Sequence, residues 1–373
     1  MRYPKLKMTT ASAARLTAAA KRIWGAATHP NYNVRMKVRH INRYLIHKLT
    51  GAQRIAGLEI QHTYRCNARC SFCSMGDAVS SRKDMDPALF DRVLSEAKKE
   101  GIVLFTFLGG ETFIDRNLFK YLDLCWDAGI RTEIQSNGTL LTEDLLLKLK
   151  QAHVQNVVVT LHGTTSQEHD GVYQVKGAFD RVMHAFAFAR KIGLPMSMKT
   201  LYSKRTERDG TFYKILNLAK EQNVGLNVNP FMPVGNGFED AERLDAAGAA
   251  KFRSIAAADS TVSSHIFNDG ECTGCFAGKD YFCVTPEGDL LPCYFMPLSI
   301  GNIQTTRLRE AHRRAMEIPI FAERFPICYV AESETFYQKC LVPLHKNYKK
   351  LPVNILEHPE VADLLKQFNM SNL

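Results

Sequence analysis

Ten cysteines carry most of the chemical information in this 373-residue sequence, and nine of them fall into two groups. The first group spans eight residues with the spacing C-x3-C-x2-C, at Cys66, Cys70 and Cys73. The sequence has no pattern of an export signal, so we expect a reducing compartment, the cytoplasm. Clustered cysteines in such a compartment bind metals or carry redox chemistry rather than form disulfides. Cys125 stands alone on an expected helix and is interpreted as a buried apolar side chain.

The first group has the donor set of an iron–sulfur cluster with one iron left open. Three thiolates close together can hold three corners of a cubane [4Fe–4S] cluster, and no fourth cysteine lies beside them. The open iron can then bind a ligand through an amine and a carboxylate. The alternative is a closed tetrahedral zinc site with His62 as fourth ligand, although structural zinc sites usually have paired C-x2-C spacing.

At these residues the chain resembles the radical S-adenosylmethionine (SAM) enzymes, whose signature is C-x3-C-x-aromatic-C with Phe72 as the aromatic residue. The resemblance implies that Cys66, Cys70 and Cys73 hold a [4Fe–4S] cluster whose open iron binds SAM. It also implies reductive cleavage of SAM to a 5′-deoxyadenosyl radical, which removes a hydrogen atom from an unactivated carbon. A flavodoxin or ferredoxin is the implied electron donor.

Other segments match the family's motifs in the family's order. A GGE segment follows the second expected strand, an SNG segment follows the third, and an MPVGNG turn follows the sixth. Each alone would be an ordinary turn, and the assignment rests on their order behind the cysteines. The SAM contacts that the resemblance implies are Phe72, Gly109, Gly110, Glu111, Ser136, Asn137, Thr160, His162, Met232 and Pro233.

Strand-like and helix-like segments alternate from residue 57 to about 230, which predicts parallel strands joined by crossover helices. We expect an α/β fold, a partial (β/α)6 TIM-like barrel followed by a small domain with a β-hairpin, which the resemblance also implies. The active residues of such a barrel lie at the C-terminal ends of its strands. The expected strands are 57–63, 102–108, 131–135, 156–161, 195–201 and 225–229, and the expected helices are 86–99, 117–128, 142–151, 177–192 and 211–222.

The second cysteine group surrounds an expected β-hairpin, YFCVT–PEGD–LLPCYF. The spacing from Cys275 through Gly288 to Cys293 resembles the start of the SPASM and twitch extensions of radical SAM enzymes, which hold an auxiliary [4Fe–4S] cluster. Few cysteines follow, so one auxiliary cluster is expected and not two; the alternative is a structural zinc hairpin. Four ligands are expected from Cys272, Cys275, Cys293, Cys328 and Cys340. We favour Cys275, Cys293 and Cys328, and the fourth ligand is left open between Cys272 and Cys340. Cys283 is interpreted as a packed thiol.

The chain is expected to divide into five parts. These are a basic helical arm at 1–56, the radical SAM barrel at 57–237, a helical bridge at 238–267, the SPASM/twitch-like domain at 268–345 and a helical tail at 346–373.

The composition is that of a globular protein, with 45% hydrophobic and 23% charged residues. It excludes collagen, long disorder and a disulfide miniprotein, and no apolar stretch is long enough to span a membrane. The net charge of +10 lies in the arm, which has twelve basic and no acidic residues before Glu59. Val34, Val38, Ile41, Leu45 and Leu49 recur at helical spacing. Such a helix either covers the barrel or contacts an anionic membrane through residues 1–50, which would place the protein peripherally at the inner membrane face.

The sequence leaves the substrate open among an organic small molecule, a lipid and a peptide. We favour a small molecule or lipid, because residues 1–56 lack the hairpin of a winged-helix module that binds leader peptides. A peptide-modifying enzyme is the alternative. A third hypothesis is a non-catalytic iron–sulfur or zinc scaffold on nucleic acid, but few aromatic residues are interleaved with the basic residues of the arm, so nucleic acid is not expected.

Overall fold

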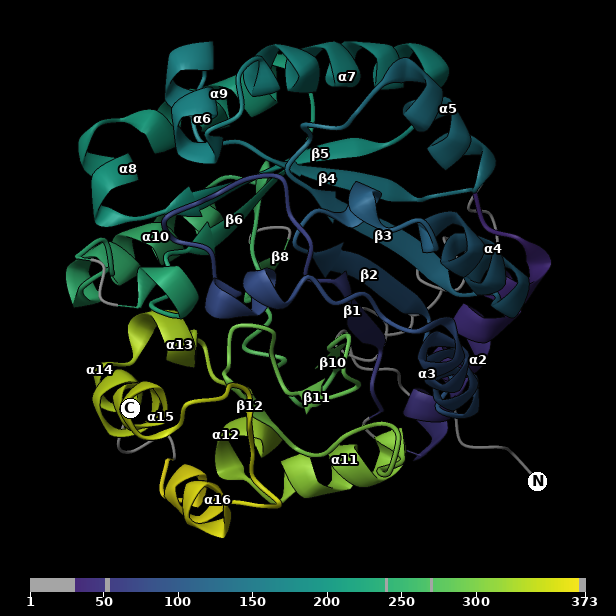
Figure 1. Cartoon of the computed structure of the whole chain (residues 1–373), viewed down its shortest axis with the longest axis vertical. Helices are drawn as coiled ribbons and strands as arrows, with labels where there is room; N and C mark the ends of the chain where they lie inside the picture. Colours follow the sequence, from purple (N-terminus) through teal and green to yellow (C-terminus); the bar gives the residue numbers. More distant parts are fainter. Residues whose placement is uncertain (1–30, 51–53, 239–240, 269–270, 369–373) are drawn as a thin grey trace, which may run out of the picture.

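A curved sheet of nine strands forms the centre of the molecule in the computed structural model, with helices covering its outer face (Figure 1). The structure describes residues 31–50, 54–238, 241–268 and 271–368. The strand order is β11-β10-β1-β2-β3-β4-β5-β6-β7, and β1 to β6 are parallel to their neighbours. The expected α/β class and partial barrel are therefore confirmed.

The six barrel strands lie close to where the alternation of the sequence places them. They are β1 Gly57–Thr63, β2 Leu104–Gly109, β3 Arg131–Ser136, β4 Asn156–Thr160, β5 Met196–Tyr202 and β6 Leu226–Pro230. The crossover helices are α3 Pro87–Lys99, α4 Leu118–Ala128, α5 Glu143–Gln151, α7 Ala178–Ile192 and α9 Thr211–Glu221. Two short helices, α6 Ser166–Tyr173 and α8 Lys204–Arg208, and a 3-10 turn at Gly76–Ser81 occupy loops at the strand exits.

Local chemistry fixes where these helices begin and end. Asp86 caps α3 by accepting a hydrogen bond from Ala88 N, and Pro87 takes the first helical position, where its missing N–H costs nothing. Thr142 caps α5 in the same way through Leu145 N. Gly129 ends α4 in the left-handed conformation at φ +68°, which glycine adopts without strain.

An aromatic layer joins the start of the barrel to its outer helices. Phe90 of α3 stacks on Tyr121 of α4 at 4.1 Å between ring centroids, and both rings are fully buried. Phe90 also packs on Phe105 and Phe107 of β2. Burial of this layer presses the outward face of β1 and β2 onto α3 and α4, so the inward face is left to line the barrel interior.

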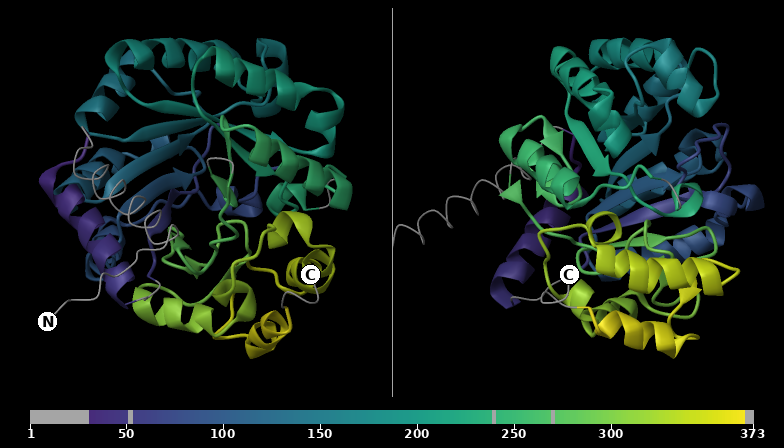
Figure 2. Two further views of the ribbon diagram at one scale, coloured as in Figure 1. Left: turned by 180° about the vertical axis from the view of Figure 1, so that it is seen from behind. Right: turned by 90° about the vertical axis from the view of Figure 1, so that its left-hand side faces the viewer.

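The C-terminal part of the chain closes one side of the barrel rather than standing apart from it (Figures 1 and 2). The expected hairpin is present as β10 Tyr281–Val284 and β11 Leu290–Leu291, which pair antiparallel. Its β10 also pairs in parallel with β1, from Gly57 opposite Tyr281 to Ile60 opposite Val284. The other edge of the sheet is extended by β7 Val262–Ser263. The second cysteine group is thereby tied to the strand that carries the first.

Short elements complete the C-terminal part. The expected helical bridge contains α10 Ala246–Ala258, and the expected tail contains α16 Pro359–Lys366. The others are β8 Phe267–Asn268, β9 Glu271–Cys272, β12 Leu298–Ser299, β13 Val353–Asn354, α11 Leu308–Met316, α12 Pro319–Ala322, α13 Tyr329–Glu332, α14 Glu334–Phe336, a π-helical turn Tyr337–Leu341 and α15 Val342–Asn347.

The basic arm contains one described helix, α2 Val34–Thr50, on the outside of the barrel near α4. Residues 1–30 lie outside the described residues. The helix is the expected one, but its apolar row of Val34, Val38, Leu45 and Leu49 is exposed. Among the described residues, no helix has the length and apolar content needed to cross a bilayer.

Candidate functional site

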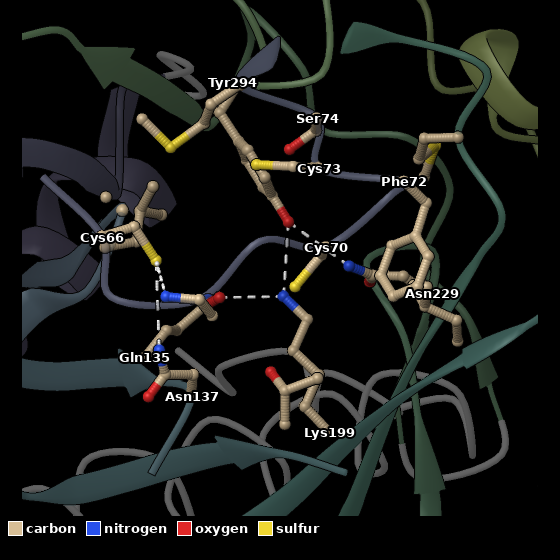
Figure 3. Close-up of a pocket in the computed structure, with 18 of the residues that line it drawn as sticks. Cys66, Cys70, Phe72, Cys73, Ser74, Gln135, Asn137, Lys199, Asn229 and Tyr294 are labelled. Carbon is tan, nitrogen blue, oxygen red and sulfur yellow. Dashed lines mark hydrogen bonds between the residues drawn. The ribbon is translucent and has the colours of Figure 1, made fainter. Parts of the chain in front are cut away.

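The three thiols of the first group lie on the loop that follows β1, where the barrel strands end. Cys66, Cys70 and Cys73 all line a cavity of about 200 Å³, which we call the first cavity (Figure 3). The loop is held by backbone bonds, from Arg69 N to Tyr173 O and from Cys73 N to Cys70 O, both 3.3 Å. The spacing of the cysteines in the sequence therefore does bring them to one site.

The thiols are in surroundings that disfavour their anionic form. Burial, with a smaller contribution from the neighbouring thiols, raises the pKa of Cys66 to about 11 and that of Cys70 to about 12. Thiolates are the form that binds metal. A group carrying positive charge, such as the iron of a cluster, would offset this penalty, so the donor set fits a cation-containing group held by all three.

A closed zinc site with His62 is not what the structure forms. His62 is fully buried, its Nδ1 lies 2.8 Å from Asp115 Oδ2, and its ring packs on Phe107 and Tyr121 in the outer aromatic layer. It does not line the first cavity. Across the described ranges, no three His, Cys, Asp or Glu side chains converge in an arrangement for a single metal ion.

The glycines of the GGE segment allow two strand ends to approach closely. A Cβ on Gly109 would overlap the carbonyl oxygen of Thr63, and a Cβ on Gly110 would overlap that of Arg65. Gly110 N donates to Thr63 O at 2.9 Å, and Glu111 N donates to Arg65 O at 2.7 Å. Both glycines line the first cavity, but their close approach is to the start of the cysteine loop.

Glu111 positions the neighbouring strand end rather than facing the cavity. Its fully buried carboxylate accepts hydrogen bonds from Ser136 Oγ at 2.7 Å, Asn137 N at 2.8 Å and Phe113 N at 3.2 Å. These bonds orient Ser136 and Asn137, which do line the first cavity. Asn137 Nδ2 lies 4.0 Å from Cys66 Sγ, so Glu111 acts on the cysteine loop through the third strand.

The remaining expected SAM contacts also differ in whether they line the first cavity. Phe72, Thr160, His162 and Met232 line the first cavity, whereas Pro233 does not. The ring of His162 packs edge-on against Phe72 at 5.0 Å, and burial lowers its pKa to about 3, so the imidazole is neutral at physiological pH. The MPVGNG turn reaches the loop through Asn236 N, which donates to Cys73 O at 2.9 Å.

Sequence reasoning missed a polar network on the inner wall of the first cavity. Lys199 of β5 is 9% exposed, and its Nζ donates to Gln135 Oε1 at 2.8 Å and to Tyr294 OH at 3.3 Å. Asn229 Nδ2 also donates to Tyr294 OH, at 3.3 Å (Figure 3). A signal existed in the sequence, because Lys199 is the single charge in the strand MSMKTLY, whose neighbouring residues are mostly apolar.

The network also borders a second cavity of about 560 Å³ deeper in the barrel. Gln135, Lys199, Asn229 and Tyr294 line both cavities. Burial lowers the pKa of Lys199 to about 8, an effect that the nearby Glu59 opposes, and burial raises the pKa of Glu59 to about 7. Lys199 and Glu59 therefore both lie in the barrel interior. The charged form of each is strongly stabilised there by an oppositely charged neighbour.

The second cavity gathers the preferred cysteines of the C-terminal group. Cys275, Cys293 and Cys328 line its wall. Burial raises the pKa of all three thiols, and each of Cys293 and Cys328 is raised further by Cys275. Cys328 Sγ lies 4.0 Å from Sδ of Met232, a residue of the first cavity, so a single side chain separates this thiol from the first site.

The other cysteines lie outside both cavities. Cys272 is exposed on β9, with its Sγ 4.0 Å from Pro326 O, two residues before Cys328. Cys340 is fully buried in the π-helical turn. Cys283 is buried in β10 beside β1, and Cys125 is buried on α4, as expected of packed thiols.

A third cavity of about 360 Å³ leads from the cysteine loop toward the C-terminal segment. It shares Gln61, Ser74 and Met75 with the first cavity, and its far wall includes His345, Lys349 and Lys350. Tyr294 and Phe295 line all three cavities. The three cavities therefore adjoin one another around Tyr294 and Phe295.

Comparison with known proteins agrees with this arrangement. The model of the radical SAM superfamily matches residues 60–219, and that of the SPASM iron–sulfur cluster-binding domain matches residues 275–333. The first match covers the barrel with the cysteine loop, and the second covers three cysteines of the second cavity.

Curated relatives include heme synthases and peptide cyclases. The AdoMet-dependent heme synthase of Methanosarcina barkeri is 27% identical over 300 residues, covering 72% of this chain and 84% of the relative. The PqqA peptide cyclase of Methylocella silvestris is 25% identical over 272 residues, covering 68% of this chain and 73% of the relative.

Solved structures share the fold at low identity. SuiB of Streptococcus suis bound to the precursor peptide SuiA aligns with a TM-score of 0.57 and 16% identity, covering 84% of this chain and 79% of SuiB. The enzyme anSMEcpe with bound AdoMet and the Cp18Cys peptide aligns with a TM-score of 0.56 and 19% identity, covering 76% of this chain and 87% of that one. The cysteine loop at the strand ends lies within the radical SAM match, and the cysteine-bearing hairpin lies within the SPASM match. The chain belongs to the radical SAM superfamily and carries a SPASM domain.

Proposed function

We propose that this protein is a radical SAM/SPASM enzyme that modifies a peptide at an unactivated carbon and uses one auxiliary [4Fe–4S] cluster. When bound, the first cluster and SAM supply a 5′-deoxyadenosyl radical for hydrogen abstraction, and the auxiliary cluster supplies an electron acceptor. The chain's own residues hold these groups, exclude water and orient the substrate. A flavodoxin or ferredoxin is the proposed electron donor.

The observation that carries the proposal is that the two cysteine-lined cavities are adjacent and share lining residues. We assign Cys66, Cys70 and Cys73 to the SAM-binding cluster and Cys275, Cys293 and Cys328 to the auxiliary cluster. The Lys199–Tyr294 network lies in the wall that the two cavities share. A substrate held there would have SAM on one side and an electron acceptor on the other, which suits net oxidation or a crosslink.

Cys272 is the better fourth auxiliary ligand of the two that the sequence left open. Its thiol approaches the segment that leads into Cys328, and its exposure leaves it free to turn toward the second cavity. Cys340 is fixed in the core by the π-helical turn, and burial alone accounts for its raised pKa. This assignment keeps the auxiliary site to four cysteines and one cluster.

A peptide is the favoured substrate class, and the site offers three adjoining cavities to hold it. The third cavity adjoins the first, and its lining includes the exposed side chains of Lys349 and Lys350. The similarity to PqqA peptide cyclases supports the same substrate class. This reverses the order that the sequence alone favoured. A small molecule remains the second candidate, because the 27% identical relative is an AdoMet-dependent heme synthase.

Lys199 is proposed to bind a carboxylate of the substrate. The ammonium group is nearly buried, and its hydrogen bonds go to the neutral side chains of Gln135 and Tyr294, while the nearby Glu59 favours its charged form. A buried cation favours an anionic partner strongly, since water does not screen the interaction. The network would therefore fix which carbon of the substrate faces the first cavity.

Replacing Cys66, Cys70 and Cys73 together with Ala is expected to abolish SAM cleavage and leave about four irons per chain, those of the auxiliary cluster. The reason is that the first cavity then lacks all three of its sulfur donors. Release of 5′-deoxyadenosine after anaerobic reconstitution with dithionite measures cleavage, and iron analysis measures the remaining cluster. Cleavage by the triple variant would refute the assignment.

Cys293→Ala and Cys272→Ala are each expected to lower auxiliary iron while SAM cleavage persists, because neither thiol lines the first cavity. Cys340→Ala is the matched control and should keep full iron content. Iron and sulfide analysis with 5′-deoxyadenosine release checks all three variants. Unchanged iron in Cys293→Ala, or loss of iron only in Cys340→Ala, would contradict the ligand set.

Lys199→Met is expected to reduce product formation by roughly 10- to 100-fold, the cost of about 1.5–3 kcal/mol for losing a charged hydrogen bond. SAM cleavage without substrate should be retained, and Lys199→Arg should recover part of the activity. Because the pKa of Lys199 is about 8, wild-type turnover should decline as pH rises through 8 and the ammonium loses its proton. Lys214→Met on the outer surface is the control; wild-type activity in Lys199→Met would exclude the role.

The substrate class is tested by comparing cells with and without the gene. Mass spectrometry of extracted peptides should reveal a peptide that loses hydrogen or gains a crosslink only when the wild-type gene is present. The cysteine triple variant should lack the product. A changed metabolite or tetrapyrrole, with an unchanged peptide pool, would instead establish the second candidate.

A further inference from the structure

We propose that α2 binds the surface of an anionic membrane and holds the enzyme there peripherally. The surface concerned, called the α2 face, consists of the exposed apolar row Val34, Val38, Leu45 and Leu49 together with the basic groove beside it. The proposal rests on this face alone and is independent of the substrate proposed above.

The apolar row is unusual for a surface helix. Val34 is 75% exposed, Val38 50%, Leu45 42% and Leu49 84%. Their spacing of four, seven and four residues places them on one side of the helix. At 1.5 Å per residue the row extends for about 22 Å. Half of the large exposed hydrophobic residues found among the described residues belong to this one helix.

Contacts on the opposite side fix the orientation of the helix. Met36 is buried, and Asn33 Nδ2 donates to Trp126 O at 2.8 Å. A Cβ on Gly129 of the barrel would overlap Arg35, so the helix lies directly on this turn. These contacts prevent α2 from turning its apolar row inward, and the exposure of the row is built into the packing.

The arginines of α2 reach the barrel without losing their charge. Arg35 donates to Asp127 O, Arg39 Nη1 to Ile102 O at 3.3 Å, and Arg43 Nη1 to Ile55 O at 2.6 Å. All three acceptors are backbone carbonyls, which carry no net charge. Among the described residues, no carboxylate forms an ion pair with these arginines.

These cations border a groove of about 500 Å³ between α2 and the end of α3. Its basic lining residues are Arg35, Arg39, Arg43, Arg54, Lys98 and Lys99, against a single acid, Glu100. Lys99 is paired with Glu96, and Glu100 with Arg309. The groove therefore keeps a net positive charge next to the apolar row, the combination that binds anionic lipid head groups and inserts side chains between them.

The positive charge of the α2 face, together with its apolar row, argues against the other possible binding partners. A second copy of the chain would bring the same cations and be repelled. Residues 1–30 carry six basic and no acidic residues, so this segment adds positive charge rather than neutralising the groove. Nucleic acid would satisfy the cations but leave the apolar row in water. An anionic lipid surface satisfies both features, and the neighbouring basic segment would strengthen it.

The test uses the full-length, cluster-loaded protein and sedimentation with vesicles. Vesicles of equal parts phosphatidylcholine and phosphatidylglycerol should bind the protein, more weakly as salt concentration rises, and pure phosphatidylcholine should bind it poorly. The combined variant Val38→Ser, Leu45→Ser and Leu49→Ser should lose about tenfold or more in partitioning. Lys98→Gln, at an exposed site in the groove, should weaken binding and its salt dependence.

The matched control is the pair Leu147→Ser and Leu356→Ser, which are 40% and 47% exposed on other surfaces and should bind vesicles like the wild type. SAM cleavage by each variant checks that the fold is intact. Absence of binding to the anionic vesicles, or equal binding by the triple serine variant, would overturn the proposal. A dimer in solution that the triple variant converts to a monomer would also overturn it, in favour of a second copy.

Discussion

The rest of this structure depends on one constraint. The cysteine thiols must ionise to bind a cluster, but their burial opposes ionisation. Cys66 and Cys70 have pKa values raised to about 11 and 12, and the thiols of the second cavity are raised as well. Each set becomes a good ligand only when a positive group joins it. The fold keeps these costly groups together by anchoring their loops through backbone contacts, such as Gly110 against Arg65 and Asn236 on Cys73.

The same β1 strand serves both sites. Its C-terminal end leads into the first cysteine loop, and its edge pairs with β10, which carries the hairpin of the second group. Both sets of thiols are thus held in place by the same strand. The space between them is lined by residues of the barrel strands, whose side-chain directions are set by the sheet. Side chains on neighbouring strands, Gln135, Lys199 and Asn229, then converge on Tyr294 in that space. A rigid frame of this kind can present one carbon of a substrate to a reactive species while keeping an electron acceptor on the other side.

Local sequence patterns predicted the barrel well, because each of its elements is encoded by nearby residues. The alternation of strands and helices, the caps at Asp86 and Thr142, and the PEGD hairpin all depend on short-range chemistry. The pairing of β10 with β1 was not predictable in this way, since it joins residues more than 200 positions apart. The family resemblance implied a SAM contact at Glu111, whereas the structure shows that its buried carboxylate holds Ser136 and Asn137. The exposure of the apolar row of α2 was not predictable from its spacing, because long-range contacts orient the helix: Met36 is buried against the barrel side, and the arginines donate to barrel carbonyls.

The central claim is that the chain holds two chemically distinct clusters, of which one has an iron open to SAM. Electron paramagnetic resonance of the anaerobically reconstituted and reduced wild-type protein tests it most directly. Two overlapping signals are expected, one of which changes its g-values when SAM is added while the other is unaffected. A single signal that does not respond to SAM, or a protein that binds zinc in place of iron, would contradict it.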